Sequence, residues 1–154
     1  MNTSRKQKLF GISLTAIWMA VIFALSHQPA EQSSELSGSL LSLVLSLVSL
    51  LPVTVDAEWL HFFVRKTAHF TAYFILGVLV DHTVRLFFER RSISFVLASV
   101  ISILYAISDE YHQTFIPGRS GEVRDVIIDG FGALCGIFVY RIIHYVTIKA
   151  KKPD

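Results

Sequence analysis

Two groups of polar residues in this sequence have the types and spacing needed to bind an anion or to transfer a proton. Lys66, His69 and Tyr73 lie three and four residues apart, so they share one face of a helix. Further along the chain, four polar residues fall within five positions, one helical turn after Tyr105: Asp109, Glu110, His112 and Gln113. A histidine beside carboxylates can accept and donate protons, and a lysine can bind phosphate.

A third polar group follows a short turn rich in glycine and proline. Asp125 and Asp129 lie one turn apart on the helix expected after it, and the connecting segment also carries Arg119 and Arg124. Arginine side chains and the backbone amides at a helix start both suit a phosphate group. The turn is equally well explained as a simple connection in which Arg119 pairs with Asp125 or Glu122. Both interpretations are compatible with the sequence.

The elements that must position these residues are predicted to be membrane-spanning helices. The chain has 154 residues, of which 53% are hydrophobic and 17% charged, and its mean hydropathy is +0.55. A membrane helix needs about 20 mainly apolar residues, and four runs approach that length: residues 9–26, 67–84, 92–108 and 126–145. We therefore predict an all-α fold, a small polytopic bundle of four transmembrane helices that forms a single membrane domain over residues 1–154.

Two apolar runs allow more than one interpretation. The first run ends in Ala24-Leu25-Ser26, which resembles a signal-peptide cleavage site, although its long apolar core favours an uncleaved anchor. Residues 36–52 place their serines on one narrow stripe, which predicts an amphipathic helix within an extracytoplasmic segment over residues 27–58. Such a helix can lie in the membrane interface, enter the membrane partway or cross it.

The distribution of basic residues predicts the orientation of the bundle. With four spans and both termini cytoplasmic, ten Lys and Arg residues lie on the cytoplasmic side: Arg5, Lys6, Lys8, Arg85, Arg90, Arg91, Arg141, Lys149, Lys151 and Lys152. Four others lie outside: Arg65, Lys66, Arg119 and Arg124. This arrangement follows the positive-inside rule, whereas a fifth span at residues 36–52 would violate it. All three polar groups then lie at the outer end of the bundle.

Burial in the membrane should force these ionisable side chains together. A charged residue inside the hydrocarbon costs about 2.5–3.5 kcal/mol, so His69, Asp109 and Asp129 should face one another or a hydrated cavity rather than lipid. Gly132 and Gly136 form a G-x-x-x-G pattern on the helix face that carries Asp129, which predicts the close approach of another helix. The sequence thus predicts a tightly walled polar pocket where three helix ends meet.

Several classes of function are disfavoured by the sequence. The net charge of +2 and the dispersed basic residues do not indicate nucleic-acid binding, and the single Cys135 cannot form an internal disulfide. Zincin, G-x-S-x-G, P-loop and dinucleotide-binding patterns are missing from the sequence. A divalent cation held by the acidic residues is chemically reasonable, but their spacing does not select it, so we expect no metal and no cofactor.

The polar motifs resemble those of the VanZ-like membrane protein family over about residues 60–140. The matching segments are Arg65-Lys66-Thr67-Ala68-His69-Phe70 with Tyr73 and Gly77, Ser108-Asp109-Glu110-Tyr111-His112-Gln113, Phe115-Ile116-Pro117-Gly118-Arg119, and Arg124-Asp125-Val126 followed by Asp129, Gly132 and Gly136. The resemblance implies a multi-pass protein of the bacterial plasma (inner) membrane and cell envelope. It also implies a link to low-level teicoplanin resistance, but no defined reaction.

We expect the outer pocket to bind the head group of an anionic membrane lipid or a lipid-linked cell-wall intermediate. The candidate ligand-binding residues are Lys66, Tyr73, Tyr105, His112, Gln113, Arg119, Arg124, Asp125 and Asp129. The candidate catalytic residues are His69, Asp109 and Glu110. One alternative is a membrane hydrolase or transferase that acts on such a lipid, and another is a structural or partner-binding protein whose polar cluster locks the helices together.

Overall fold

The computed structural model describes residues 4–33, 35, 38, 42, 46 and 56–150. Within these residues, four helices are long and apolar enough to cross a membrane: α1 (Arg5–Ser26), α3 (Ala57–Arg85), α4 (Arg91–Gln113) and α5 (Val123–Ala150). The predicted all-α bundle of four spans is therefore confirmed. The amphipathic helix expected over residues 36–52 lies largely outside the described residues.

The starts of α1 and α3 are set by side chains that bond the free amides of the first turn. Ser4 caps α1 in a reciprocal arrangement, because its Oγ accepts from the amide of Gln7 at 3.3 Å while its own amide donates to Gln7 Oε1 at 2.9 Å. Asp56 caps α3 by accepting from the amide of Glu58 at 2.9 Å. This cap places the start of α3 ten residues before the predicted apolar span, so Arg65 and Lys66, expected near the start of this helix, lie well inside it.

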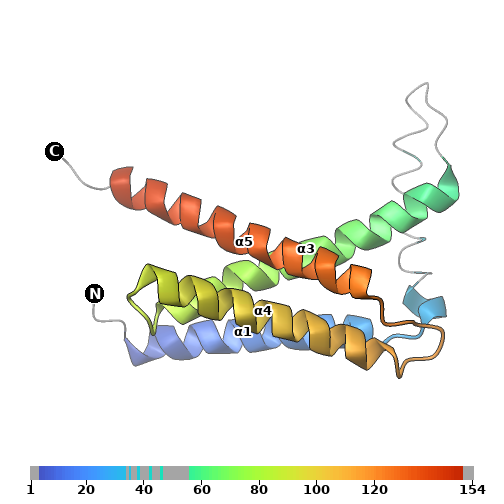
Figure 1. The fold of residues 1–154 in the computed structure, drawn as a ribbon, viewed down its shortest axis with the longest axis horizontal. Helices are drawn as coiled ribbons and strands as arrows, with labels where there is room; N and C mark the ends of the chain where they lie inside the picture. The colour runs from blue at the N-terminus through green and yellow to red at the C-terminus, as the bar shows by residue number, and fades with distance from the viewer. Residues whose placement is uncertain are drawn as a thin grey trace.

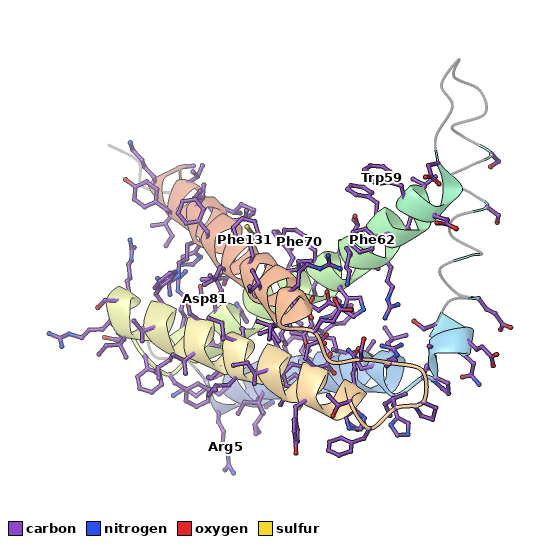
Figure 2. All side chains as sticks on the ribbon, turned by 45° about the vertical axis from the view of Figure 1, so that its right-hand side comes forward. Arg5, Trp59, Phe62, Phe70, Asp81 and Phe131 are labelled. Atoms are coloured by element: carbon purple, nitrogen blue, oxygen red, sulfur yellow. The ribbon has the colours of Figure 1, made fainter. Side chains whose placement is uncertain are left out.

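Helices α3 and α5 cross at the centre of the molecule, and α1 and α4 pack on α3 (Figure 1). The crossing is very close because glycine lies on both helices. A Cβ at Gly132 would lie 2.6 Å from the carbonyl oxygen of Phe70, and a Cβ at Gly136 or Gly77 would likewise overlap the backbone of the opposing helix. The close approach predicted from Gly132 and Gly136 is thus confirmed. Figure 2 shows Phe70 and Phe131 meeting beside this crossing, with ring centroids 6.1 Å apart.

The first helix is held against the bundle by polar contacts to backbone carbonyls. Trp18 donates its indole N–H to the carbonyl of Ala72 on α3 at 2.9 Å. Tyr105 of α4 donates its hydroxyl to the carbonyl of Met19 at 2.6 Å. In an apolar solvent such bonds have little competition from water, so they fix α1 against both neighbours.

An ion-pair cluster closes one end of the bundle, where α1 begins and α3 turns into α4 (Figure 1). Asp81 of α3, labelled in Figure 2, is fully buried. It accepts hydrogen bonds from both Nε and Nη2 of Arg141 on α5. Arg141 also donates to the carbonyl of Arg91 and to Ser94 Oγ, each at 2.8 Å. This cluster joins α3, α4 and α5.

Apolar side chains cover the outside of the bundle. Val96, Phe138 and Ile143 are each more than half exposed, whereas Leu76 and Ile137 fill the centre. This distribution suits a protein whose surrounding solvent is lipid.

Candidate functional site

The other end of the bundle, where α1 and α4 end and α3 and α5 begin, holds the candidate site and is called the site end below. The structure brings nine of the predicted site residues together there: Lys66, His69, Tyr73, Asp109, Glu110, Gln113, Arg119, Asp125 and Asp129. Their side chains come from α3, α4, α5 and the loop between α4 and α5. The predicted convergence of three helix ends is therefore found in the structure.

Asp109 is the centre of a hydrogen-bond network that joins α1, α3 and α4. Its Oδ2 accepts from Ser26 Oγ at 2.8 Å, from the Tyr73 hydroxyl at 3.0 Å and from Gln113 Nε2 at 3.4 Å. All four side chains are buried. Asp109 Oδ1 is buried without a hydrogen-bond partner among the described residues, so all three bonds converge on Oδ2, and they support the helix packing as well as the site.

Arg119 fastens the loop between α4 and α5 to the end of α1. Its Nε donates to the carbonyl of Gln28 at 2.9 Å, its Nη2 to the carbonyl of Leu25 at 3.1 Å, and its Nη1 to Gln113 Oε1 at 3.2 Å. Burial lowers the pKa of Arg119, and nearby Arg65 lowers it further, whereas the charges of Asp109 and Glu110 act in the opposite direction. Its three hydrogen bonds show that the guanidinium of Arg119 donates largely to acceptors within the protein.

The same loop makes a turn that only glycine adopts easily. Gly118 has a φ of 74°, and a Cβ there would lie 2.9 Å from the Cβ of Ala30. The carbonyl of Pro117 accepts from the amide of Ala30 at 3.2 Å. The loop thus packs directly on the segment that follows α1.

Lys66 is paired with Asp125 in a partly buried ion pair between α3 and α5. Its Nζ also lies 5.3 Å from the ring centroid of Phe62. The pairing neutralises the first acidic residue of α5, for which the sequence had offered Arg119 as one possible partner. The same ion pair engages Lys66, a residue that we expected to contact a ligand.

His69, Glu110 and Asp129 form a second, less satisfied group. One possible ligand atom from each lies within 4.8 Å of the others, and His69 Nδ1 is 3.7 Å from Asp129 Oδ2, beyond hydrogen-bond distance. Glu110 Oε2 accepts from the amide of Glu122 at 3.1 Å. Glu110 Oε1 and both carboxylate oxygens of Asp129 have no hydrogen-bond partner among the described residues.

Three predicted site residues point elsewhere. Tyr105 bonds the backbone of α1, as described above. His112 faces α1, where its Nε2 lies 3.1 Å from Nδ1 of His27 and its ring packs on Phe23. Arg124 is exposed, with its Nη2 3.4 Å from Glu122.

Two residues at the site were not among the candidate ligand-binding or catalytic residues. Ser26 was considered only as part of a cleavage-like segment, yet its hydroxyl bonds Asp109. Arg65 lies near Arg119, and its Nε is buried without a hydrogen-bond partner in the described part of the chain. Its position four residues before His69 is the signal that could have placed it on the site face of α3.

A groove of about 550 Å³ lies between α1 and α3 and reaches the site end. Apolar residues form almost all of its walls: Trp18, Val21, Ile22, Leu25, Leu60, Phe63, Val64, Thr67, Ala68, Thr71, Ala72 and Ile75. Leu25 links the groove to the polar network because its carbonyl accepts from Arg119. Thr67 and Ala68 lie on the same turn of α3 as Lys66 and His69.

Comparison with known proteins gives one match. The family model described as VanZ/LLP1 matches residues 11–144, which include most of α1, the site end and most of α5. Neither a curated protein nor a solved structure matches the chain. Since the match covers nearly the whole sequence, the protein belongs to the VanZ/LLP1 family, in agreement with the resemblance of its polar motifs.

Proposed function

We propose that this protein binds an anionic amphiphile of the membrane, such as a lipid or a lipid-linked cell-wall intermediate. The hydrocarbon chain would lie in the groove between α1 and α3, and the head group would lie against Arg65 at the site end. The observation that carries this proposal is that an apolar groove leads to a cluster of cationic side chains.

The groove has the dimensions and chemistry of a ligand site. Binding pockets for small molecules commonly enclose about 300–1,000 Å³ and have mainly apolar walls with a few polar groups at one end. The groove is about 550 Å³ in volume and lies between α1 and α3. An acyl or isoprenoid chain fits such a cleft better than a soluble polar ligand does.

Arg65 is the cation best placed to contact a negatively charged head group. Lys66 is paired with Asp125, and Arg119 is bonded to two carbonyls and to Gln113. Arg65 retains a buried Nε without a partner among the described residues, and it lies near the like charge of Arg119. A phosphate or carboxylate beside the two guanidinium groups would relieve their repulsion and supply the acceptor that Arg65 lacks.

The expected orientation gives this site access to lipids of the outer leaflet. With both termini in the cytoplasm of a bacterium, the site end lies at the outer face of the plasma membrane. Head groups of anionic lipids and of lipid-linked cell-wall precursors occupy this depth. A role in resistance to teicoplanin, which the family resemblance implies, would then follow from an altered supply or exposure of such a lipid.

Lipid co-purification tests the proposal. The protein and its variants are purified in mild detergent from bacterial membranes, and bound lipids are measured by mass spectrometry. Arg65→Gln should lower the amount of bound anionic lipid at least about fivefold, and Ala68→Trp, which fills the groove, should do the same. Arg124→Gln changes an exposed cation at the same end and serves as the control. Equal lipid content in wild type and both test variants would rule the proposal out.

A second candidate is a hydrolase or transferase acting on the same lipid. The observation that favours it is the position of His69 beside two buried carboxylates, an arrangement that can deliver or remove a proton. His69→Ala should then cause the same change in the cellular lipid profile as deletion of the gene, although the variant still binds lipid. An unchanged profile in both strains would leave binding alone as the function.

A further inference from the structure

We propose that His69, Glu110 and Asp129 form a site for a divalent transition-metal ion of the zinc, manganese and iron class. The three residues come from α3, α4 and α5 and converge inside the site end. This inference is independent of lipid binding, because it depends only on these three side chains.

The first observation is that three of the four carboxylate oxygens in this group are buried without a hydrogen-bond partner among the described residues. Asp129 is 0% exposed and Glu110 is 3% exposed. Both oxygens of Asp129 and one oxygen of Glu110 lack a hydrogen-bond donor within the described ranges. A buried carboxylate that is unpaired is strongly destabilising, so native proteins normally supply a donor or a cation. A metal ion among these oxygens would supply that positive charge.

The balance of charge at the site end also favours the binding of a cation. Asp109, Glu110, Asp125 and Asp129 are four buried carboxylates. Lys66 neutralises Asp125, and the partners of Asp109 in the described residues are uncharged donors. Among the described residues, His69 is the one ion-pair partner of the Glu110–Asp129 pair.

The second observation is the distance between the ligand atoms. Ligands that bind one ion at about 2.0–2.2 Å can lie up to roughly 4.4 Å apart. His69 Nδ1 and Asp129 Oδ2 are 3.7 Å apart, which already fits two ligands of one ion and is too long for a hydrogen bond. All three ligand atoms lie within 4.8 Å of one another, so a small rotation of one side chain would complete the set.

The ligand types select the class of metal. One imidazole and two carboxylates suit zinc, manganese or iron better than magnesium or calcium, which prefer oxygen ligands alone. Three protein ligands leave a coordination position open for water or for a phosphate oxygen. Glu110 is also oriented by a neighbour, because its other oxygen accepts from the amide of Glu122.

The backbone around the site is fixed by helix packing, which favours a preformed metal site. His69 precedes Phe70, whose carbonyl lies against Gly132, and Asp129 lies one turn before that glycine on α5. The crossing of α3 and α5 therefore sets the separation of two of the three ligands. Metal binding would need side-chain adjustment only.

The test measures metal binding by the full-length protein in detergent, without added lipid. After removal of bound metal with a chelator and then of the chelator, Zn²⁺ and Mn²⁺ are titrated by calorimetry, and thermal unfolding is followed with and without each ion. Wild type should bind one ion per chain and unfold at a higher temperature when it is bound. Asp129→Asn and Glu110→Gln should each weaken binding at least about tenfold. Glu122→Gln removes a nearby exposed carboxylate and should bind as wild type does.

Two outcomes would overturn the proposal. One is that wild type, folded by circular dichroism, binds neither ion at micromolar concentrations. The other is that folded Asp129→Asn binds as tightly as wild type. Because Asn and Gln keep the size of the original side chains, circular dichroism should show folded variants, and His69→Gln provides a further ligand variant if either one fails to fold. Loss of lipid binding would not change these results, so the two proposals can fail separately.

Discussion

Asp109 receives hydrogen bonds from α1, α3 and its own helix α4 at a single carboxylate oxygen. In the low dielectric of a membrane protein, each of these bonds is protected from water and each donor would be left unsatisfied if the acceptor were lost. Asp109 is therefore foremost a residue that holds helices in register. A catalytic role, which the sequence suggested, would have to operate within this structural constraint.

The Tyr73 hydroxyl tests how much this network contributes. Tyr73→Phe removes one hydrogen bond to Asp109 and keeps the buried ring in place. We expect the free energy of unfolding to fall by about 1–3 kcal/mol, because a bond to a buried charged group is lost. Tyr111→Phe, which alters an exposed tyrosine on α4, should change stability little. Thermal or denaturant unfolding in detergent measures both variants, and equal stability would contradict a structural role for the hydroxyl.

At the scale of single residues, the sequence identified the polar residues of the site but not their hydrogen-bond and ion-pair partners. Residue type and helical spacing placed Lys66, His69 and Asp109 on facing helix surfaces, and the structure brings them to one end. Lys66 and Arg119 were expected to contact a ligand, yet both have protein partners. Which cation remains unpaired depends on distances between helices, and a single sequence carries no information about these distances.

The crossing of α3 and α5 is the element-scale feature on which the site depends. Backbone carbonyls of α3 lie in the space where side chains at Gly132 and Gly136 would be, and Gly77 receives the backbone of α5 in the same way. Because these contacts are with backbone atoms, no flexible side chain can move aside to make room for a Cβ at these positions. The two helices can therefore keep their present separation only with glycine at these positions.

Gly136→Ala should accordingly be far more damaging than an alanine elsewhere on α5. The added methyl group would overlap the Phe74 carbonyl, so the helices must separate, and we expect a loss of more than about 2 kcal/mol in stability together with reduced metal or lipid binding. Gly130→Ala is the matched control, because a Cβ there meets only Ile103 Cγ1 at 3.8 Å. That control should be neutral or slightly stabilising, since alanine favours helix. Similar melting temperatures for the two variants would contradict the packing argument.

Helix packing was more predictable than helix length. The G-x-x-x-G spacing in α5 directly indicated a close crossing, and Gly77 had no such pattern to identify its reciprocal contact. The start of α3 was placed too late because Arg65 and Lys66 interrupt the apolar run. Their charges are tolerated within the helix since Lys66 is paired and both lie near its polar end.

At the scale of the whole molecule, buried polar clusters close both ends of an otherwise apolar bundle. The site end has several carboxylate oxygens without a hydrogen-bond partner in the described part of the chain, whereas in the opposite cluster Arg141 bonds Asp81, Ser94 and a backbone carbonyl. This difference separates a structural cluster from a candidate site. Fold class and number of spans followed from hydropathy, but the groove between α1 and α3 depends on how α1 packs and was not predictable from the sequence.

The Asp81–Arg141 pair gives a prediction about the opposite end. Asp81→Leu leaves a largely buried guanidinium without its counterion and should cost about 3–5 kcal/mol of stability. The double variant Asp81→Leu/Arg141→Met replaces the pair with apolar side chains and should recover most of that loss. Unfolding measurements on the single and double variants check this coupling. A double variant no more stable than the single one would show that the pair contributes through something other than charge compensation.

The attachment of Arg119 to the carbonyls of Leu25 and Gln28 has a consequence for biogenesis. The first helix leaves the ribosome early, but the arginine that fastens its end belongs to the loop before the last helix. When only α1, α3 and α4 of a nascent chain have been inserted, Trp18 and Tyr105 can already hold α1. The carbonyls at the end of α1 do not yet have Arg119 as their hydrogen-bond donor. The end of α1 can therefore be fastened only after the loop between α4 and α5 has been synthesised, so the groove is completed after α1, α3 and α4 have been inserted.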